Sequence, residues 1–166
     1  MTTMVNEEFD IQIKDNFLNK KELKILLSNI NKIQYLPMVN ERGNFGFRHD
    51  FDKNLNNEWL FKKIKEQFFP SVDLKVCSSS YHLRHNHSEV FSHTDENDYN
   101  FLLYLKGKEL VYNGTGFYSK NNLNTYIGFV ENRALFFNGK NNTHTTLQAL
   151  GESSPRYTIN IFYNYV

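Results

Sequence analysis

The order of apolar and polar residues changes character part-way along the chain. Up to about residue 70, two stretches place apolar side chains three or four positions apart, which is typical of amphipathic helices. From Val72 onward, apolar and polar residues alternate in short runs, which is typical of half-buried strands. The pattern therefore predicts N-terminal helices followed by a mainly β region.

Two helices are predicted in the first part of the chain. Asn19 can cap the first, which is expected to run to about Lys32. The second is expected from about Asn56 to Phe69, and Pro70 ends it because proline lacks the backbone donor that a helix needs. The buried stripe of this second helix would be Leu60, Phe61, Ile64 and Phe68.

Short strands are predicted elsewhere. Residues 9–13 alternate and favour a strand, whereas the polar segment 40–54 is interpreted as a loop. Strand-like runs follow at 72–83, 90–95, 99–105, 115–119, 125–130, 133–138, 143–149 and 156–163. Many short strands separated by turn residues indicate a sandwich or barrel. We predict a mainly β fold, a double-stranded β-helix (jelly roll) with the two helices packed on its outside.

Bulk properties narrow the class of protein. The 166 residues favour one domain, with 1–70 as a helical support region and 71–166 as the β-helix core. A net charge of +1, with the basic residues spread out, gives no indication of a nucleic-acid or membrane partner. The single cysteine, Cys77, is predicted to be buried in a strand and to point to a reducing compartment. With no signal-peptide pattern at the N-terminus, the expected location is the cytoplasm.

The chemistry-bearing pattern begins with His93 and Asp95, two positions apart. His144 lies 49 positions after Asp95, and Arg156 lies 12 positions further on. Two imidazoles and one carboxylate can occupy one face of an octahedral iron and leave three coordination positions open. In a strand, residues two apart point to the same side, so His93 and Asp95 would face one interior together. A His-x-Asp pair alone is weak evidence, and the surroundings carry the hypothesis.

The last predicted strand adds a polar stripe. Arg156, Thr158 and Asn160 alternate with apolar neighbours and would share one face. Burying such a stripe without partners is costly, and a bound dicarboxylate would satisfy it. The arginine fork suits a carboxylate, and the hydroxyl of Tyr104 can reach the same ligand if its strand faces that way.

These motifs resemble the 2-oxoglutarate/Fe(II) dioxygenases, and within them the prolyl-hydroxylase-like branch with its small bacterial and phage relatives. The segments that carry the likeness are 93–95, 101–105, 114–118, 132–137, His144 and 156–160, and it covers most of the chain. Residues 40–54 and 82–90 are matched poorly. The resemblance implies that His93, Asp95 and His144 ligate Fe(II). It further implies that Arg156 binds the distal carboxylate of 2-oxoglutarate, helped by Thr158 and Tyr104, with Tyr81 near the cosubstrate.

The resemblance also implies a reaction. With O2, and with ascorbate as an optional reductant, the enzyme would convert 2-oxoglutarate to succinate and hydroxylate a small molecule or a peptidyl residue. Asp95 stands where the related halogenases lack a carboxylate, which favours hydroxylation. Two alternatives stay open: a non-catalytic cupin or jelly-roll binding module, and a different metalloenzyme built on His82, His85 and His87 with Glu89.

Other polar residues are expected to be solvated or to have a structural role. His82, His85 and His87 are expected to be solvated loop residues, as is His49 beside Asp50. Arg133 is expected to be a structural turn residue. Three further arginines are expected to be mostly solvated, with lining of the pocket mouth as the alternative: Arg42, Arg48 and Arg84.

Overall fold

The computed structural model describes residues 4–6, 10–41, 43–51, 57–85, 91–110, 113–146 and 155–166. About half of these residues belong to two antiparallel sheets. The larger sheet comprises β1 (Met4–Asn6), β2 (Ile11–Lys14), β3 (Leu36–Asn40), β4 (Gly43–Asp50), β5 (Leu74–Arg84), β6 (Tyr99–Lys106), β9 (Ala134–Asn138) and β11 (Arg156–Tyr165). Its spatial order is β1-β2-β9-β6-β11-β5-β4-β3. The smaller sheet has the order β10 (Thr143–Thr146), β7 (Thr115–Ser119), β8 (Asn122–Ile127).

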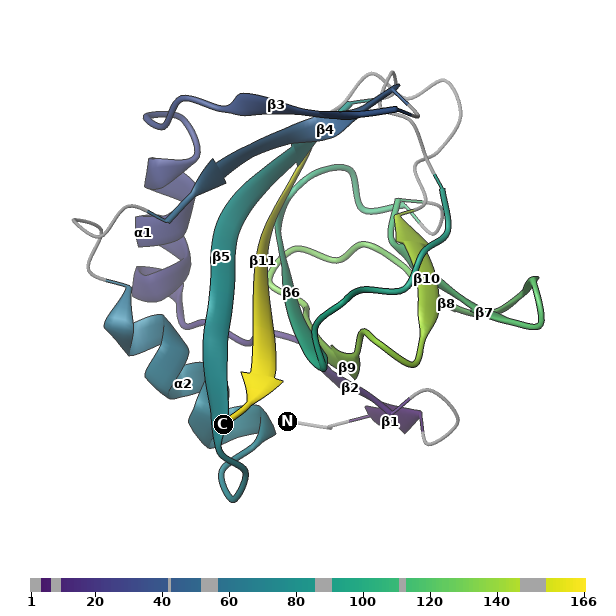
Figure 1. Ribbon diagram of the computed structural model, residues 1–166. Coiled ribbons are helices and arrows are strands. Elements are labelled where there is room, and N and C mark those ends of the chain that lie inside the picture. Colours follow the sequence, from purple (N-terminus) through teal and green to yellow (C-terminus); the bar gives the residue numbers. More distant parts are fainter. Residues whose placement is uncertain are drawn as a thin grey trace.

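The layers are arranged as helices, large sheet, small sheet (Figure 1). Helices α1 (Lys20–Asn29) and α2 (Glu58–Phe68) cover one face of the large sheet, and the small sheet faces the other. On β6, Phe101 and Leu103 belong to the core under the helices, whereas Leu102 and Tyr104 belong to the core between the sheets. Because both faces of β6 are covered, its residues read as a continuous apolar run.

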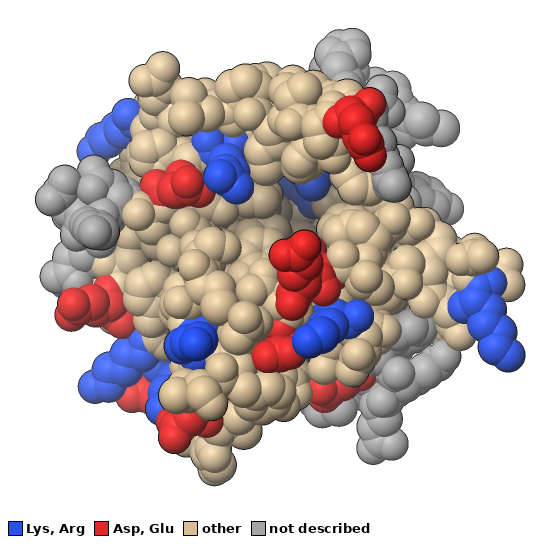
Figure 2. Space-filling view, in the orientation of Figure 1, with Lys and Arg blue, Asp and Glu red and all other residues tan. Residues whose placement is uncertain are grey.

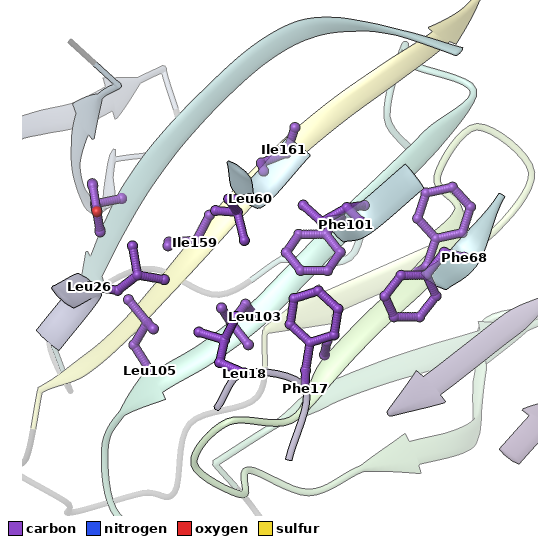
Figure 3. Packing of buried hydrophobic residues seen from close by; sticks show 14 of the residues in the cluster. Phe17, Leu18, Leu26, Leu60, Phe68, Phe101, Leu103, Leu105, Ile159 and Ile161 are labelled. Atoms are coloured by element: carbon purple, nitrogen blue, oxygen red, sulfur yellow. The ribbon is translucent and has the colours of Figure 1, made fainter. Parts of the chain in front are cut away.

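The helix-side core is dense with aromatic and branched side chains. Figure 3 shows Leu26 of α1 and Leu60 of α2 packed over residues of β6 and β11. Phe68 of α2 lies near Phe101 and stacks on Phe136, at ring-centroid distances of 5.8 and 5.5 Å. This core holds the large sheet against the helices. The opposite face of that sheet can therefore present polar residues toward the small sheet.

The two predicted helices are confirmed. Asn19 forms a capping box with Glu22, and its side chain accepts hydrogen bonds from the backbone N–H groups of Lys21 and Glu22. The first helix ends at Asn29, earlier than expected. In the second helix, Phe61 is partly buried, while the other three residues of its predicted stripe are buried.

Several predictions of local structure were wrong. Residues 43–50, expected in a loop, form β4, which pairs with both β3 and β5. Its polar residues reflect a position near the edge of the sheet, and Gly46 adopts φ +133° within it. Residues 91–95 do not form a named strand, and His93 makes an isolated bridge with His144 instead. The strand expected at 125–130 is β8, which lies earlier, at Asn122–Ile127.

Cys77 was predicted to be buried, and it is exposed. The pairing of β5 with β11 skips this residue, because the register shifts where Phe162 faces Ser78 and Tyr163 faces Val76. A bulged residue is left out of the ladder. In addition, β4 pairs with β5 only over Ser80–Leu83, so the edge of β5 opposite β11 is not paired with β4 at Cys77. Across the described residues, neither helix has the length and apolar character needed to cross a membrane.

Candidate metal centre and adjoining pocket

The three predicted metal ligands are brought together by backbone pairing between a loop and the small sheet. His144 lies on β10, and its backbone exchanges two hydrogen bonds with that of His93, at 2.9 and 2.8 Å. The backbone N–H of Asp95 donates to the carbonyl of Gly139 at 3.0 Å. The segment therefore behaves like a strand locally, which keeps His93 and Asp95 on one side.

The ligand atoms of His93, Asp95 and His144 lie within 4.8 Å of one another. Nε2 of His93 is 3.6 Å from Oδ1 of Asp95, and Nε2 of His144 is 3.1 Å from Oδ2. The two imidazole rings are 4.7 Å apart between centroids. The structure thus forms a compact cluster of two nitrogens and one carboxylate.

Both imidazoles are oriented by backbone carbonyls. Nδ1 of His93 lies 3.2 Å from the carbonyl oxygen of Phe91, and Nδ1 of His144 lies 2.9 Å from that of Asn142. A carbonyl oxygen can only accept, so each Nδ1 carries the proton and donates. In the neutral form of each ring, Nε2 then carries the lone pair and directs it at the cluster, which is how metal-binding histidines are commonly held. This donor set fits a divalent metal such as Fe(II).

Ionisation of the cluster also favours a cation. Burial raises the pKa of Asp95, but the hydrogen bond and charge of His144, with the charge of His93, outweigh it and hold that pKa below its ordinary value. Burial, and then the charge of His144, lowers the pKa of His93. A carboxylate beside an unprotonated imidazole is the state that a metal requires.

Asn100 and Gly139 support Asp95, and the sequence did not reveal either role. The amide of Asn100, on β6, donates a short hydrogen bond to Oδ2 of Asp95. A Cβ atom on Gly139 would lie 2.8 Å from both Nδ2 and Oδ1 of Asn100. Gly139 lies in the turn after β9, and its lack of a side chain makes room for the amide that orients the carboxylate.

Gly139→Ala is expected to weaken divalent-metal binding by about ten- to a hundredfold, because the displaced Asn100 no longer holds Asp95. Calorimetric titration with Mn(II) measures this. Lys140→Ala, in the same turn but exposed, serves as the control and should bind like the unchanged protein. Equal affinities in both variants would show that Asn100 does not orient the ligand.

Arg156 is a buried cation with no acidic partner in the described part of the chain. Its Nη1 donates to the carbonyls of Asn113 and Gly114 at 3.2 and 2.7 Å. Its Nη2 donates to the hydroxyl of Thr146 at 2.9 Å, while Nε makes no hydrogen bond there. Burial lowers the pKa of Arg156, which is the sign of a charge without compensation.

Tyr104 and Thr158 lie close to this arginine. The guanidinium of Arg156 is 5.7 Å from the centre of the Tyr104 ring. The hydroxyl of Tyr104 is 2.8 Å from that of Thr115, which lines the pocket described below. Thr158 neighbours Tyr104 across the β11–β6 pair, and its hydroxyl donates to Asn160 at 2.8 Å. The structure therefore gathers Arg156, Thr158 and Tyr104, and adds Thr115.

Tyr81 does not reach this site, so its expected position near the cosubstrate was wrong. Its hydroxyl accepts a hydrogen bond from Asn29 of α1 at 3.2 Å, and its ring packs 4.8 Å from that of Phe51. Both contacts lie in the helix-side core. Alternation along β5 sends Ser80 and His82 to the pocket and Tyr81 to the opposite face.

A pocket of about 660 Å³ adjoins the cluster. Figure 2 shows the molecule hollowed between its two halves, with basic side chains in and beside the hollow. All three members of the cluster line the pocket. Its other polar lining residues include Arg48, Asp50, Ser80, His82, Arg84, Asn100, Thr115 and Asn160, and its apolar ones include Met38, Phe45, Phe91, Leu102 and Phe162.

His82 was expected to be a solvated loop residue, and this was wrong. Arg48 and Arg84 line the pocket, which was the alternative to the solvated position expected for them. His82 and Arg84 lie on β5, facing the pocket. Alternation along β5 places both on the face opposite Tyr81, but it does not indicate which of the two faces lines the pocket. His49 was expected in a loop, and it lies on β4 with Nδ1 2.8 Å from the carbonyl of Gln34. Arg133 is structural as predicted, since it donates to both carboxylate oxygens of Asp15.

The alternative histidine cluster gains no support from the described residues. There, His93, Asp95 and His144 form the only close group of three metal-binding side chains. The ring of His85 packs against that of Phe47 at 5.5 Å. His87, Glu89 and Arg42 lie outside the described residues.

His82 is held neutral, and this predicts a pH effect on stability. Burial, then the charges of Arg84 and Arg48, lowers the pKa of His82 to about 3. An unfolded histidine titrates near 6.5, so below that pH the unfolded chain binds a proton that the folded chain refuses. Stability is therefore lost as the pH falls from about 6.5 toward 3.

His82→Gln removes this titration but keeps a polar side chain. Between about pH 7 and pH 4, the unfolding free energy of this variant should fall less than that of the unchanged protein. The difference between the two falls should exceed about 1 kcal/mol. Urea unfolding at the two pH values measures this difference. If the unfolding free energy of the two proteins falls by the same amount between these pH values, His82 takes up a proton in the folded protein.

No protein-family model matches the sequence, and a search of curated proteins finds no match. Solved structures, in contrast, match over nearly the whole chain. HygX from Streptomyces hygroscopicus, solved with nickel, 2-oxoglutarate and hygromycin B, is 10% identical with a TM-score of 0.73, over 95% of this chain and 84% of that chain. A prolyl-4-hydroxylase from Pseudomonas putida is 13% identical with a TM-score of 0.67, over 95% of this chain and 94% of that chain.

A third match is the viral collagen prolyl hydroxylase of Paramecium Bursaria Chlorella virus-1. It is 15% identical with a TM-score of 0.63, over 94% of this chain and 90% of that chain. The chain has the fold of the 2-oxoglutarate/Fe(II) oxygenases. Prolyl hydroxylases are among these structural neighbours, as the sequence motifs predicted.

Proposed function

We propose that this protein is a 2-oxoglutarate- and Fe(II)-dependent oxygenase. The observation that carries the proposal is the cluster of His93, Asp95 and His144, with each imidazole Nε2 free to bind metal. The three side chains would hold Fe(II) and leave part of its coordination sphere open. Bound iron supplies the activation of O2 that is coupled to decarboxylation of 2-oxoglutarate to succinate.

Arg156 would bind the distal carboxylate of 2-oxoglutarate. The guanidinium is buried, has no acidic partner in the described residues, and keeps Nε without a hydrogen bond there. A carboxylate would neutralise this charge with a directional, charge-assisted pair. Tyr104, Thr115 and Thr158 would supply neutral hydroxyl groups around the same carboxylate.

The reaction that we propose is hydroxylation. One oxygen atom of O2 would enter succinate and the other the product, with CO2 released from 2-oxoglutarate. Asp95 keeps a carboxylate in the coordination sphere, in the position that halogenases leave for halide. Neighbours of the same fold include an epimerase and enzymes solved with a peptide or with hygromycin B, so we propose a small-molecule or peptide substrate.

Three wider assignments belong to the same proposal. The two facing antiparallel sheets with helices outside support a double-stranded β-helix. We also propose that residues 1–166 act as one domain, whose first 70 residues support the β core. The single cysteine supports a reducing compartment, and we propose the cytoplasm.

The test is turnover of 2-oxoglutarate under iron-replete conditions. With Fe(II), ascorbate and ¹⁸O2, the protein should form succinate that carries one labelled oxygen atom, slowly even without its substrate. The Asp95→Ala variant should form none. Absence of succinate, despite stoichiometric binding of iron and 2-oxoglutarate, would instead favour a binding module that has lost turnover.

A further inference from the structure

The pocket contains more basic groups than the cosubstrate requires. Arg84 on β5 lies directly across from Arg156 on β11, and Arg48 on β4 lies across from His82. Arg84 and Arg48 both line the pocket that holds the metal cluster. 2-Oxoglutarate is a dianion: Arg156 would match its distal carboxylate, and the metal would match the carboxylate beside the keto group.

Arg84 is an unpaired cation within the described part of the structure. Its guanidinium makes neither an ion pair nor a side-chain hydrogen bond there, although the residue is partly buried. Like charges placed opposite each other on adjacent strands destabilise a sheet, and here Arg84 opposes Arg156. Such an arrangement lowers the stability of the free protein and is relieved when an anion binds.

The acidic side chains that line the pocket with Arg84 interact with other partners. Asp50 lines the pocket, and its Oδ1 is 3.5 Å from Nε of Arg48. Asp95 contacts both histidines of the metal cluster. His82 contributes no charge at neutral pH, and its Nε2 lies 2.9 Å from the hydroxyl of Ser80.

The backbone beside Arg84 is shaped to accommodate it. Gly46 adopts φ +133°, and a Cβ atom there would lie 3.1 Å from Cγ of Arg84 and 3.0 Å from the carbonyl oxygen of Leu83. A larger residue would therefore press on the stem of the arginine. Close by, the rings of Phe45 and Phe91 pack at 5.8 Å and form an apolar wall of the same pocket.

We infer that Arg84, with Arg48 nearer the solvent, binds an oxyanion carried by the primary substrate, while the apolar wall contacts the rest of that molecule. The substrate class is thus a small organic acid or phosphate ester. A guanidinium fork suits either a carboxylate or a phosphate. This inference rests on the proposed function, because it assigns Arg156 to 2-oxoglutarate.

The test compares charged and neutral probes on one protein. Zn(II)-loaded protein saturated with 2-oxoglutarate is titrated with phenylacetate, phenyl phosphate and the neutral phenylacetamide, and side-chain Nε–Hε signals of arginine are followed by NMR. An anionic probe should bind about tenfold or more tightly than the amide and should shift the Arg84 signal. The tighter of the two anions identifies the group as carboxylate or phosphate.

Arg84→Met keeps the length of the stem and removes the charge. It should abolish the preference for the anion, leave 2-oxoglutarate affinity within about twofold, and leave the melting temperature unchanged or raised, because repulsion with Arg156 is gone. Arg48→Met should lose less of the preference for the anion, since Arg48 is more exposed and pairs with Asp50. Lys120→Met, in the exposed β7–β8 turn, is the control and should behave like the unchanged protein.

Three results would overturn the inference: equal binding of amide and anions, an anion preference that survives Arg84→Met, or loss of 2-oxoglutarate binding in Arg84→Met. The last would place Arg84 in the cosubstrate site. If the unchanged protein fails to bind 2-oxoglutarate at all, the proposed function fails. The titration of Zn(II)-loaded protein without 2-oxoglutarate then still decides whether Arg84 binds an anion.

Discussion

Alanine at His93, Asp95 or His144 is expected to abolish binding of Fe(II) and of its redox-inert substitute Mn(II). Each residue supplies one of three ligand atoms that lie within 4.8 Å of one another. Loss of Asp95 also removes the single negative charge of the cluster and leaves two imidazoles facing each other. Metal content of the purified variants and calorimetric titration with Mn(II) measure the effect.

His85→Ala is the matched control for these variants. It removes an imidazole from the end of β5, whose ring packs on Phe47 rather than on the cluster. The metal content of this variant should stay at one ion per chain. Retention of metal by His93→Ala together with its loss from His85→Ala would place the metal in the other histidine-rich segment.

Arg156→Lys is expected to weaken 2-oxoglutarate binding while metal binding survives. Lysine keeps a positive charge but loses the fork that pairs with a carboxylate, so it recovers only part of the affinity. Arg156→Ala removes the charge entirely and should cost about 3–5 kcal/mol of 2-oxoglutarate binding if the pair is fully desolvated. Titration of Mn(II)-loaded protein with 2-oxoglutarate measures both.

The alanine variant also loses structural contacts, so stability must be measured beside affinity. Arg156 donates to the carbonyls of Asn113 and Gly114 and to Thr146, and their loss should lower the melting temperature. Arg133→Lys, which alters an arginine paired with Asp15, is the control for 2-oxoglutarate affinity. Unchanged 2-oxoglutarate affinity in a folded Arg156→Ala protein would remove this residue from the cosubstrate site.

The placement of His93 and Asp95 on one side could be predicted from the sequence because it depends on local spacing. His93 and Asp95 share a side whether they lie in a regular strand or, as here, in a segment bridged to β10. The stripe of Arg156 and Thr158 follows the same period-two rule on β11. Spacing thus placed His93 with Asp95 and Arg156 with Thr158, whereas His144 was assigned through the resemblance to the 2-oxoglutarate/Fe(II) dioxygenases.

The side of the sheet on which a residue lies could not be predicted for β5. Alternation separates Tyr81 from His82 but does not say which of them faces the helices. Tyr81 packs in the helix-side core, whereas His82 and Arg84 line the pocket. A polar face that lines a pocket has the same sequence pattern as one that faces water, which is why these two residues were interpreted as solvated.

Asn100 lies only five residues from Asp95, but the room for its amide depends on Gly139, which is far away in sequence. Asn100 lies on β6 and Gly139 follows β9, so no local pattern links them. They meet because β6 and β9 are paired, with Tyr99 opposite Asn138. The same holds for Gly46, whose closeness to Arg84 follows from the pairing of β4 with β5.

The most direct test of the proposed oxygenase site is a crystal structure of the protein soaked anaerobically with Fe(II) and 2-oxoglutarate, with iron located by anomalous scattering. We expect one iron bound by Nε2 of His93, Nε2 of His144 and the carboxylate of Asp95. We also expect 2-oxoglutarate on that iron, with its distal carboxylate against Arg156. Iron bound elsewhere, or 2-oxoglutarate absent from a pocket that holds iron, would contradict this proposal.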